Sequence, residues 1–203
     1  KIQEIVVGHQ AKFDNLYLEL INELKQAGIL VLNEAELDAA QGAFVHQYFL
    51  ESVRHQLFPL MLDKVKAFPT LRDTSIYLAI RLLHSDVPPR YSLVEIPVNL
   101  PRFIELPARG DARCIILLDD VIRFNLDNIY YTFEFASAEA YTIKFTRDAE
   151  LDLDPALATC VQQSLPGPRL AAPAPDPEPP PGTVSAFGMH LHSATTVDGR
   201  DRK

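Results

Sequence analysis

The spacing of apolar residues changes at Ser75, and this change restricts the fold more than any other feature of the sequence. Upstream, apolar residues recur every three to four positions, the period of a helix with one buried face. The first such set is Phe13, Leu16, Tyr17, Leu20, Leu24 and Ala27, followed by Gly28 as a helix stop. From Ser75 the period is two, as in a strand, because Ile76, Leu78, Ile80 and Leu82 fall on one face. Helices followed by strands predict an α+β fold, with N-terminal helices before a mainly antiparallel sheet.

A second helical stretch is predicted to open at Asn33, where Glu36 three residues later suits a capping box. We expect this stretch to break near Gly42, to resume and to end close to Pro59.

The strands of the second half are predicted from apolar segments bounded by prolines and turn residues. They cover residues 75–82, 91–96, 102–106, 113–118, 130–135 and 141–145. The strongly apolar segment 113–118 is expected to be buried on both sides. A short helix over residues 121–126 is expected to follow it, with Asp119 or Asp120 as its cap.

The chain is expected to divide near Asp154. Residues 155–203 hold nine of the 16 prolines, and proline removes backbone donors and favours extended conformations. We therefore expect a head region over residues 1–154 and a disordered or polyproline-like tail over residues 155–203.

Charge and composition restrict the partners. Residues 1–154 carry 15 Lys and Arg against 23 Asp and Glu, so the whole net charge of −8 lies there. An acidic surface repels nucleic acid, other polyanions and anionic membranes on average, so no nucleic-acid partner is expected. No apolar run is long enough for a membrane span, no secretory signal opens the chain, and Cys114 and Cys160 form no disulfide or metal pattern. A cytoplasmic protein is the simplest expectation.

The sequence contains no established catalytic motif. The two glycine-rich phosphate-binding motifs, G-x-x-x-x-G-K-[ST] and G-x-G-x-x-G, are absent, and so are H-E-x-x-H, C-x-x-C and G-x-S-x-G. His46 and His55 are interpreted as surface or boundary histidines rather than nucleophiles, and His190 with His192 supplies only two of four metal ligands. Asp119 and Asp120 could act as an acid–base pair, but a helix cap also explains them. We therefore assign no catalytic, cofactor-binding or metal-binding residue.

Two pairs of residues are candidates for a protein interface. The first pair is Arg102 and Phe103, which follow Pro101; the alternative is that Arg102 is an ordinary surface arginine without an interface role. Arg147 and Asp148 open an acidic run, with a solvated strand edge as the alternative. Aromatic side chains suit interface cores as well as domain cores. The aromatic candidates are Tyr77, Tyr91, Phe103, Tyr130 and Tyr131.

Five segments carry a family resemblance over about residues 9–154. They are Tyr48-Phe49 through Leu57-Phe58-Pro59-Leu60; Phe68-Pro69-Thr70-Leu71 with Ser75-Ile76-Tyr77-Leu78-Ala79-Ile80-Arg81-Leu82; Val94-Glu95-Ile96-Pro97 with Leu100-Pro101-Arg102-Phe103; Leu117-Leu118-Asp119-Asp120-Val121-Ile122 with Asn125-Leu126; and Phe145-Thr146-Arg147-Asp148-Ala149-Glu150-Leu151. In this order and spacing they resemble the head domain of bacterial polyphosphate kinases of the histidine-phosphorylating kind.

The resemblance implies a cytoplasmic enzyme that transfers the terminal phosphate of ATP to polyphosphate and back, through a phosphohistidine and with magnesium. It implies four parts: an amino-terminal helical domain that helps hold the nucleotide, a head domain that mediates dimer contacts, and two catalytic domains. The matching residues belong to the head domain, with the last stretch of the amino-terminal domain before it.

The resemblance ends after Asp154, where the family continues into a basic catalytic domain and this chain continues into its proline-rich tail. A shifted reading frame or a truncated gene would produce that change. We therefore expect a truncated polyphosphate kinase that is inactive alone, needs no cofactor, and self-associates or contacts other polyphosphate kinase domains. The alternatives are a weak ATP-binding remnant and a non-catalytic adaptor whose proline-rich tail is read by a partner.

Overall fold

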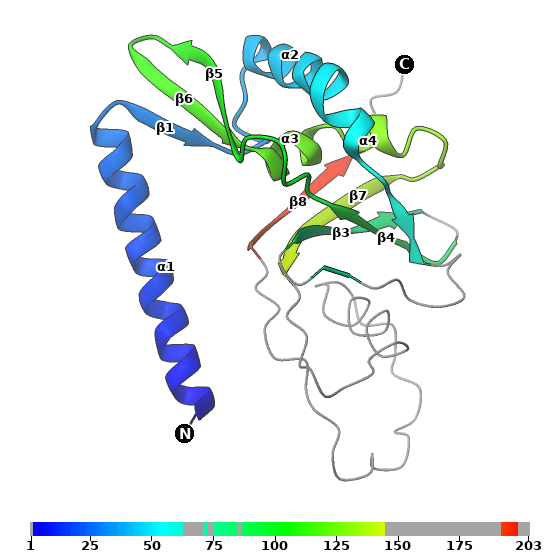
Figure 1. Cartoon of the computed structure of the whole chain (residues 1–203), viewed down its shortest axis with the longest axis horizontal. Helices are drawn as coiled ribbons and strands as arrows, with labels where there is room; N and C mark the ends of the chain where they lie inside the picture. The colour runs from blue at the N-terminus through cyan, green and yellow to red at the C-terminus, as the bar shows by residue number, and fades with distance from the viewer. Residues whose placement is uncertain (1, 63–70, 73–74, 85–86, 145–191, 199–203) are drawn as a thin grey trace. The chain divides into compact units, whose positions relative to one another are not determined.

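The computed structural model describes residues 2–62, 71–72, 75–84, 87–144 and 192–198 (Figure 1). The chain forms two compact units. The first consists of Lys1–His55 with Val98–Asn125, and the second of Gln56–Pro97 with Leu126–Lys203. None of the helices in the described ranges has the length and apolar character that crossing a membrane requires.

The first unit contains a three-stranded sheet in the order β1-β6-β5. Helix α1 (Ile2–Gln26) leads into β1 (Ile29–Leu32) through Gly28, whose φ of 77° is a conformation that glycine adopts without strain. Strand β1 pairs in parallel with β6 (Ala112–Leu117), and β6 pairs antiparallel with β5 (Phe103–Arg109).

Two helices pack on this sheet. Helix α2 (Ala39–Tyr48) contacts β5, and α3 (Leu118–Phe124) contacts β6 and α2. After α2 the chain continues through a π-helical turn, η1 (Phe49–Val53), and a 3₁₀ turn, η2 (Arg54–Gln56). The core that holds these elements is apolar and fully buried, and it includes Val45, Phe49, Cys114, Ile116, Leu118, Val121 and Ile122.

The second unit contains a five-stranded sheet in the order β2-β4-β3-β7-β8, with every neighbouring pair antiparallel. The strands are β2 (Leu60–Met61), β3 (Ile76–Leu83), β4 (Arg90–Glu95), β7 (Ser137–Lys144) and β8 (His192–Asp198), and a short helix, α4 (Leu126–Ile129), precedes β7. One face of the sheet packs with Leu62 and Leu71 over Tyr77, Leu93 and Ile143. On the other face the Tyr130 hydroxyl donates a hydrogen bond to Ser92 Oγ at 2.7 Å, and burial raises the pKa of Tyr130.

The predicted α+β class, the first helix and most strands are confirmed. Gly28 ends α1 as expected, and β3, β4, β5 and β6 match the predicted strands to within a few residues. Residues 192–198 belong to the range expected to be a disordered or polyproline-like tail, but they form β8, which pairs antiparallel with β7; the rest of residues 155–203 lies outside the described residues.

The predicted start of the second helix is wrong. The pair of Asn33 and Glu36 closes a turn, in which the Asn33 N–H donates to the Glu36 carboxylate at 3.0 Å, and α2 starts six residues later. Its capping box is made by Asp38 and Gln41. Gly42 lies inside α2 and does not break it. An added Cβ at this position would lie 3.2 Å from the Phe124 ring, so the missing side chain leaves room for that ring.

Two further predictions need correction, and one strand is new. Residues 130–135 form turns instead of a strand, since Tyr130 is buried and Phe133 packs against Arg90 by its ring face. Strand β6 is buried on one side only: Cys114 and Ile116 are buried, whereas Arg113 is exposed. Strand β1 was not predicted.

Candidate functional site

A cluster of charged side chains lies where β6 continues directly into α3. Leu117 is the N-cap, in extended conformation and without a side-chain cap, so the helix starts at Leu118. Asp119 and Asp120 therefore lie inside the first turn, where negative charge still favours the helix dipole. The prediction that one of them caps the helix is wrong. Both are buried.

Arg123 neutralises the two aspartates from one turn farther along α3. Its guanidinium forms ion pairs with Asp120 and with Asp119, the latter at 3.5 Å. These are i,i+3 and i,i+4 pairs, which the helix places on one face. Only 1% of Arg123 is exposed, so this is a desolvated ion pair rather than a surface one.

Arg102 connects the cluster to the surface. Its Nη2 atom lies 3.1 Å from Asp119 Oδ1, and its carbonyl accepts a hydrogen bond from the Leu118 N–H at 2.9 Å. About a third of its side chain remains exposed. The adjacent Phe103 is 61% exposed at the start of β5. The structure thus places the predicted pair Arg102 and Phe103 at the outer edge of a buried ionic cluster.

Glu34 adds a third carboxylate that the sequence analysis missed. It follows β1, is 7% exposed, and its oxygens accept no hydrogen bond from a donor group among the described residues. Burial, first of all, and then the charge of Asp119 raise the pKa of Asp120 to about 7, and Glu34 adds to this as a like charge. Arg123 acts in the opposite direction. Three carboxylates thus face two guanidiniums, and the raised pKa of Asp120 favours its protonated form, which lowers the buried negative charge.

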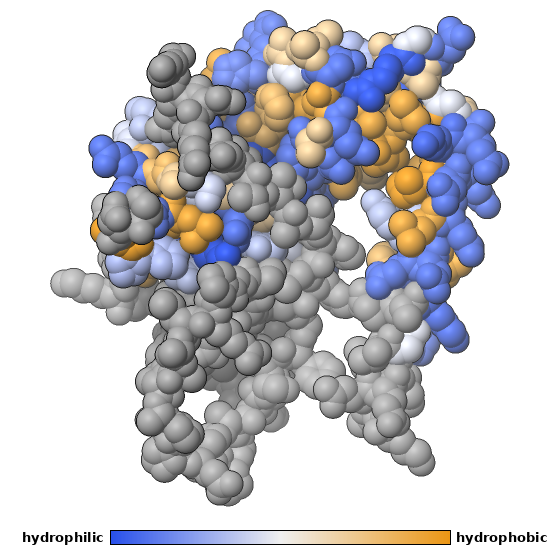
Figure 2. All heavy atoms as spheres, turned by 180° about the vertical axis from the view of Figure 1, so that it is seen from behind, coloured by the Kyte–Doolittle hydropathy of each residue, from blue (hydrophilic) through white to orange (hydrophobic). Residues whose placement is uncertain are grey.

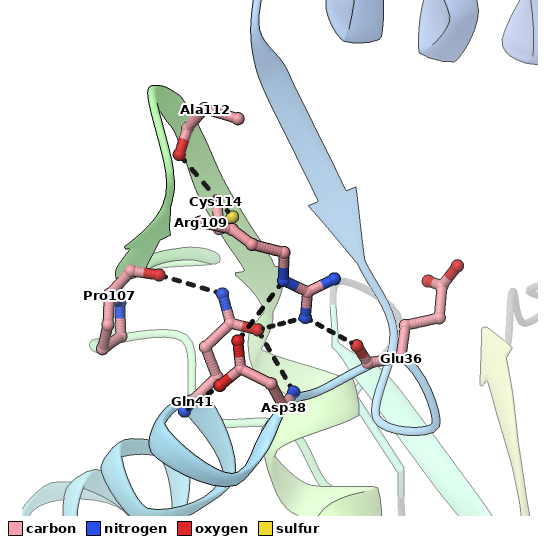
Figure 3. A network of polar contacts seen from close by, with 7 residues as sticks. All are labelled: Glu36, Asp38, Gln41, Pro107, Arg109, Ala112 and Cys114. Atoms are coloured by element: carbon pink, nitrogen blue, oxygen red, sulfur yellow. Dashed lines mark hydrogen bonds and ion pairs between the residues drawn. The ribbon is translucent and has the colours of Figure 1, made fainter.

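A second polar network closes the hairpin of β5 and β6 onto the start of α2 (Figure 3). Arg109 Nη2 donates to Gln41 Oε1 at 2.6 Å and to the Glu36 carbonyl at 2.9 Å, and Arg109 Nε lies 3.3 Å from Asp38 Oδ2. Gln41 Nε2 donates to the Pro107 carbonyl at 2.9 Å. The backbone N–H of Gln41 and the Arg109 charge lower the pKa of Asp38, with the N–H as the largest cause. The network ties the two residues of the capping box to the hairpin.

The remaining predicted residues are separate from these networks. His46 Nδ1 lies 2.8 Å from Asn125 Oδ1, and Asn125 Nδ2 donates to the Val121 carbonyl at 2.9 Å. Arg147, Asp148 and His190 lie outside the described residues. Within the ranges that the structure covers, no three His, Cys, Asp or Glu residues are grouped so as to hold a metal ion.

Comparison with known proteins identifies the family. The family model described as the polyphosphate kinase middle domain matches residues 40–166, which is more than half of the chain. The chain belongs to the polyphosphate kinase family.

Polyphosphate kinases of several bacteria align with most of this chain. The enzyme of Vibrio vulnificus (strain YJ016) is 39% identical over 158 residues, covering 75% of this chain, and that of Escherichia coli (strain K12) is 36% identical over the same length. The crystal structure of the polyphosphate kinase of Porphyromonas gingivalis superposes with a TM-score of 0.62 at 26% identity, covering 70% of this chain and 24% of that one. This polyphosphate kinase chain spans about 22% of the length of the Vibrio vulnificus protein.

The matched range contains the α3 cluster except for Glu34. Arg123 could have been found from the sequence, because its spacing of three and four residues from two aspartates is an established helix pair. Glu34 could not, since nothing in its neighbourhood indicates that β1 brings it beside α3.

Proposed function

We propose that this chain is a non-catalytic assembly segment of a polyphosphate kinase, which binds other protein surfaces, including a second copy of itself, and does not transfer phosphate alone. The transfer of the ATP terminal phosphate to polyphosphate would then belong to whole proteins of the family. The chain itself would require neither ATP nor magnesium.

The observation that carries the proposal is the state of the arginines. A transferring phosphoryl group needs several converging positive groups that are free to contact it. In the described part of the chain, six arginines form ion pairs with carboxylates instead. They are Arg72 with Glu95, Arg81 with Glu139, Arg102 with Asp119, Arg109 with Asp38, Arg113 with Glu105, and Arg123 with Asp119 and Asp120. A phosphate chain would have to displace these carboxylates.

The exposed part of the Arg102 region supports a role in protein contact. Phe103 is 61% exposed beside Arg102, whose side chain is about one-third exposed, and aromatic and arginine side chains are enriched at interface cores. Of the aromatic candidates, Tyr77 and Tyr130 are buried in the second unit, whereas Tyr131 is 64% exposed. Arg147 and Asp148 remain proposed members of the same kind of surface.

An assay of phosphate transfer tests the proposal directly. The purified 203-residue chain, incubated with magnesium-ATP and a polyphosphate primer, is expected to give no more product than the buffer, whereas a full-length family enzyme elongates the primer in the same assay. Elongation by the chain alone would overturn the proposal.

Calorimetry and sedimentation separate the alternatives. Titration with millimolar magnesium-ATP is expected to give no binding heat, and a saturable heat would favour a nucleotide-binding remnant instead. Sedimentation is expected to show reversible self-association at tens to hundreds of micromolar.

A further inference from the structure

Helix α1 exposes an apolar stripe along its middle. Phe13, Leu16, Tyr17 and Leu20 follow the spacing i, i+3, i+4, i+7, which places them on one face. Between 47% and 64% of each is exposed. Figure 2, in which α1 lies at the right, shows apolar side chains among the polar ones of this helix. An exposed apolar helix face of this length is characteristic of a surface that pairs with another protein.

The spacing of these four apolar residues is the same whether it is read from the N-terminal or the C-terminal end of the helix. The intervals are three, one and three residues, so two copies of α1 that run antiparallel present the same pattern to each other. Such a two-fold contact is isologous: Phe13 of each copy lies level with Leu20 of the other, and Leu16 lies level with Tyr17.

The charges beside the stripe favour the antiparallel arrangement. At 3.6 residues per turn, Lys12, Glu19 and Glu23 share one edge of the stripe, with the lysine nearer the N-terminus. All three are exposed. In an antiparallel pair of helices the same edges of the two copies meet, so Lys12 of each copy lies between Glu19 and Glu23 of the other, two residues from the level of each. In a parallel pair these edges lie apart, and the charge complementarity is lost.

We propose that α1 is the surface through which two copies of this chain associate, as an antiparallel helix pair with apolar contacts along the stripe and two symmetric pairs of Lys12 with Glu19. This inference rests on the self-association in the proposed function and names its surface.

The size of the stripe sets the expected strength. Four half-exposed large side chains offer on the order of 100 Å² each, since a whole aromatic side chain buries ~200 Å². Two copies would bury roughly 800 Å² from the stripe alone, below the size of most stable interfaces. The pair is therefore a weak, concentration-dependent dimer with a Kd in the micromolar range.

Sedimentation velocity of the full 203-residue chain at about 5 to 500 micromolar measures the Kd of the dimer. Leu16→Glu places a charge in the middle of the contact twice per dimer and is expected to raise the dimer Kd at least ~30-fold. Leu18→Glu is the matched control. Leu18 is 59% exposed but lies roughly 150° around the helix from the stripe, so the control is expected to keep the wild-type Kd. Circular dichroism verifies that both variants retain their helix content.

Charge reversal tests the direction of the pair. Lys12→Glu and Glu19→Lys each create two like-charge contacts and are expected to weaken the dimer about 3- to 10-fold. The double variant, K12E/E19K, exchanges the charges and is expected to return the Kd to within about 3-fold of wild type. A merely structural role of these exposed residues would give no such rescue.

The outcomes distinguish this inference from the function on which it rests. A wild-type chain that stays monomeric to 500 micromolar overturns both. A wild-type chain that associates equally well with Leu16→Glu, or whose charge variants show no rescue, overturns the α1 pairing and leaves self-association through another surface.

Discussion

Among the described residues, both units contain arginine–carboxylate pairs with little exposure, and in the first unit the carboxylates outnumber the arginines. In the second unit, Arg81 and Glu139 lie directly opposite each other on β3 and β7, 2.6 Å apart, and the Tyr141 hydroxyl donates to the same carboxylate at 3.1 Å. One charge of each sign is present. In the first unit, Asp119, Asp120 and Glu34 share Arg123 and Arg102.

The difference shows how a buried ionic cluster depends on protons. A balanced pair holds its charges over a wide pH range, because each stabilises the other. An unbalanced cluster retains a carboxyl that gains from being protonated, and its stability then changes with pH near neutrality. The first unit is therefore expected to respond to pH through its core, and the second is not.

The largest expected effect is that of Arg123→Met. Removing the guanidinium leaves Asp119 and Asp120 buried with less positive charge, which destabilises a protein by about 3–5 kcal/mol. Urea unfolding at pH 7.5 measures the change. The control is Arg113→Met, whose ion pair with Glu105 is more than half exposed and is expected to contribute less than about 1 kcal/mol. Equal effects of the two variants would contradict the assignment of a buried cluster.

Arg81→Met is expected to have the next largest effect and to lower the free energy of unfolding by about 2–4 kcal/mol. Glu139 then loses its ion pair with Arg81, and the hydrogen bond from the Tyr141 hydroxyl remains. The double variant R81M/E139M removes both charges and is expected to recover most of the loss. Unfolding followed by hydrogen exchange of β3 and β7 amides reports on this sheet. A double variant as unstable as the single one would show that packing, not charge balance, decides the effect.

The pH dependence of stability is expected to be smaller and to separate the two units. The pKa of Asp120 is raised from 3.8 to about 7 in the folded state, so between these pH values the folded state binds more protons than the unfolded state. Stability therefore falls as the pH rises through this range, by roughly 1–2 kcal/mol between pH 5.5 and 8. Asp120→Asn is expected to abolish this part of the slope, and Glu139→Gln in the second unit is expected to leave it. The comparison fails if the wild-type and D120N slopes coincide.

The smallest expected effect comes from the half-exposed network of Arg109. Arg109→Met is expected to cost about 1 kcal/mol, and the loss should shrink in 1 M salt because exposed ion pairs are screened. The loss caused by Arg123→Met should stay nearly constant in the same salt, since its pairs are buried. Thermal unfolding at low and high salt measures both, and an equal response to salt would contradict the difference in burial.

Most of the strands could be predicted because local rules determine them. The segments that form β3 and β4 are rich in apolar residues and are bounded by prolines or turn residues. This pattern can be recognised without knowing a distant partner. The first helix likewise follows from its stripe and from Gly28.

The errors arose where contacts distant in sequence decide the structure. Aromatic residues at 130–135 have strand propensity, yet Tyr130 reaches Ser92 and Phe133 reaches Arg90 in the folded unit. Asp119 and Asp120 favour a helix N-terminus either as caps or within the first turn, so residue type alone could not locate the start of α3. The place of Glu34 depends on β1, a four-residue strand whose partner lies more than 80 residues away.

That parallel pairing has a consequence for biosynthesis. Residues of β1 leave the ribosome about 80 positions before β6, and at 5–20 residues per second the delay is on the order of 4–16 s. Through this interval β1 lacks its neighbour β6, and Glu34 lacks the charged residues of α3. Nascent chains of this protein thus expose the apolar strand β1 without its partner for seconds, until β6 has emerged.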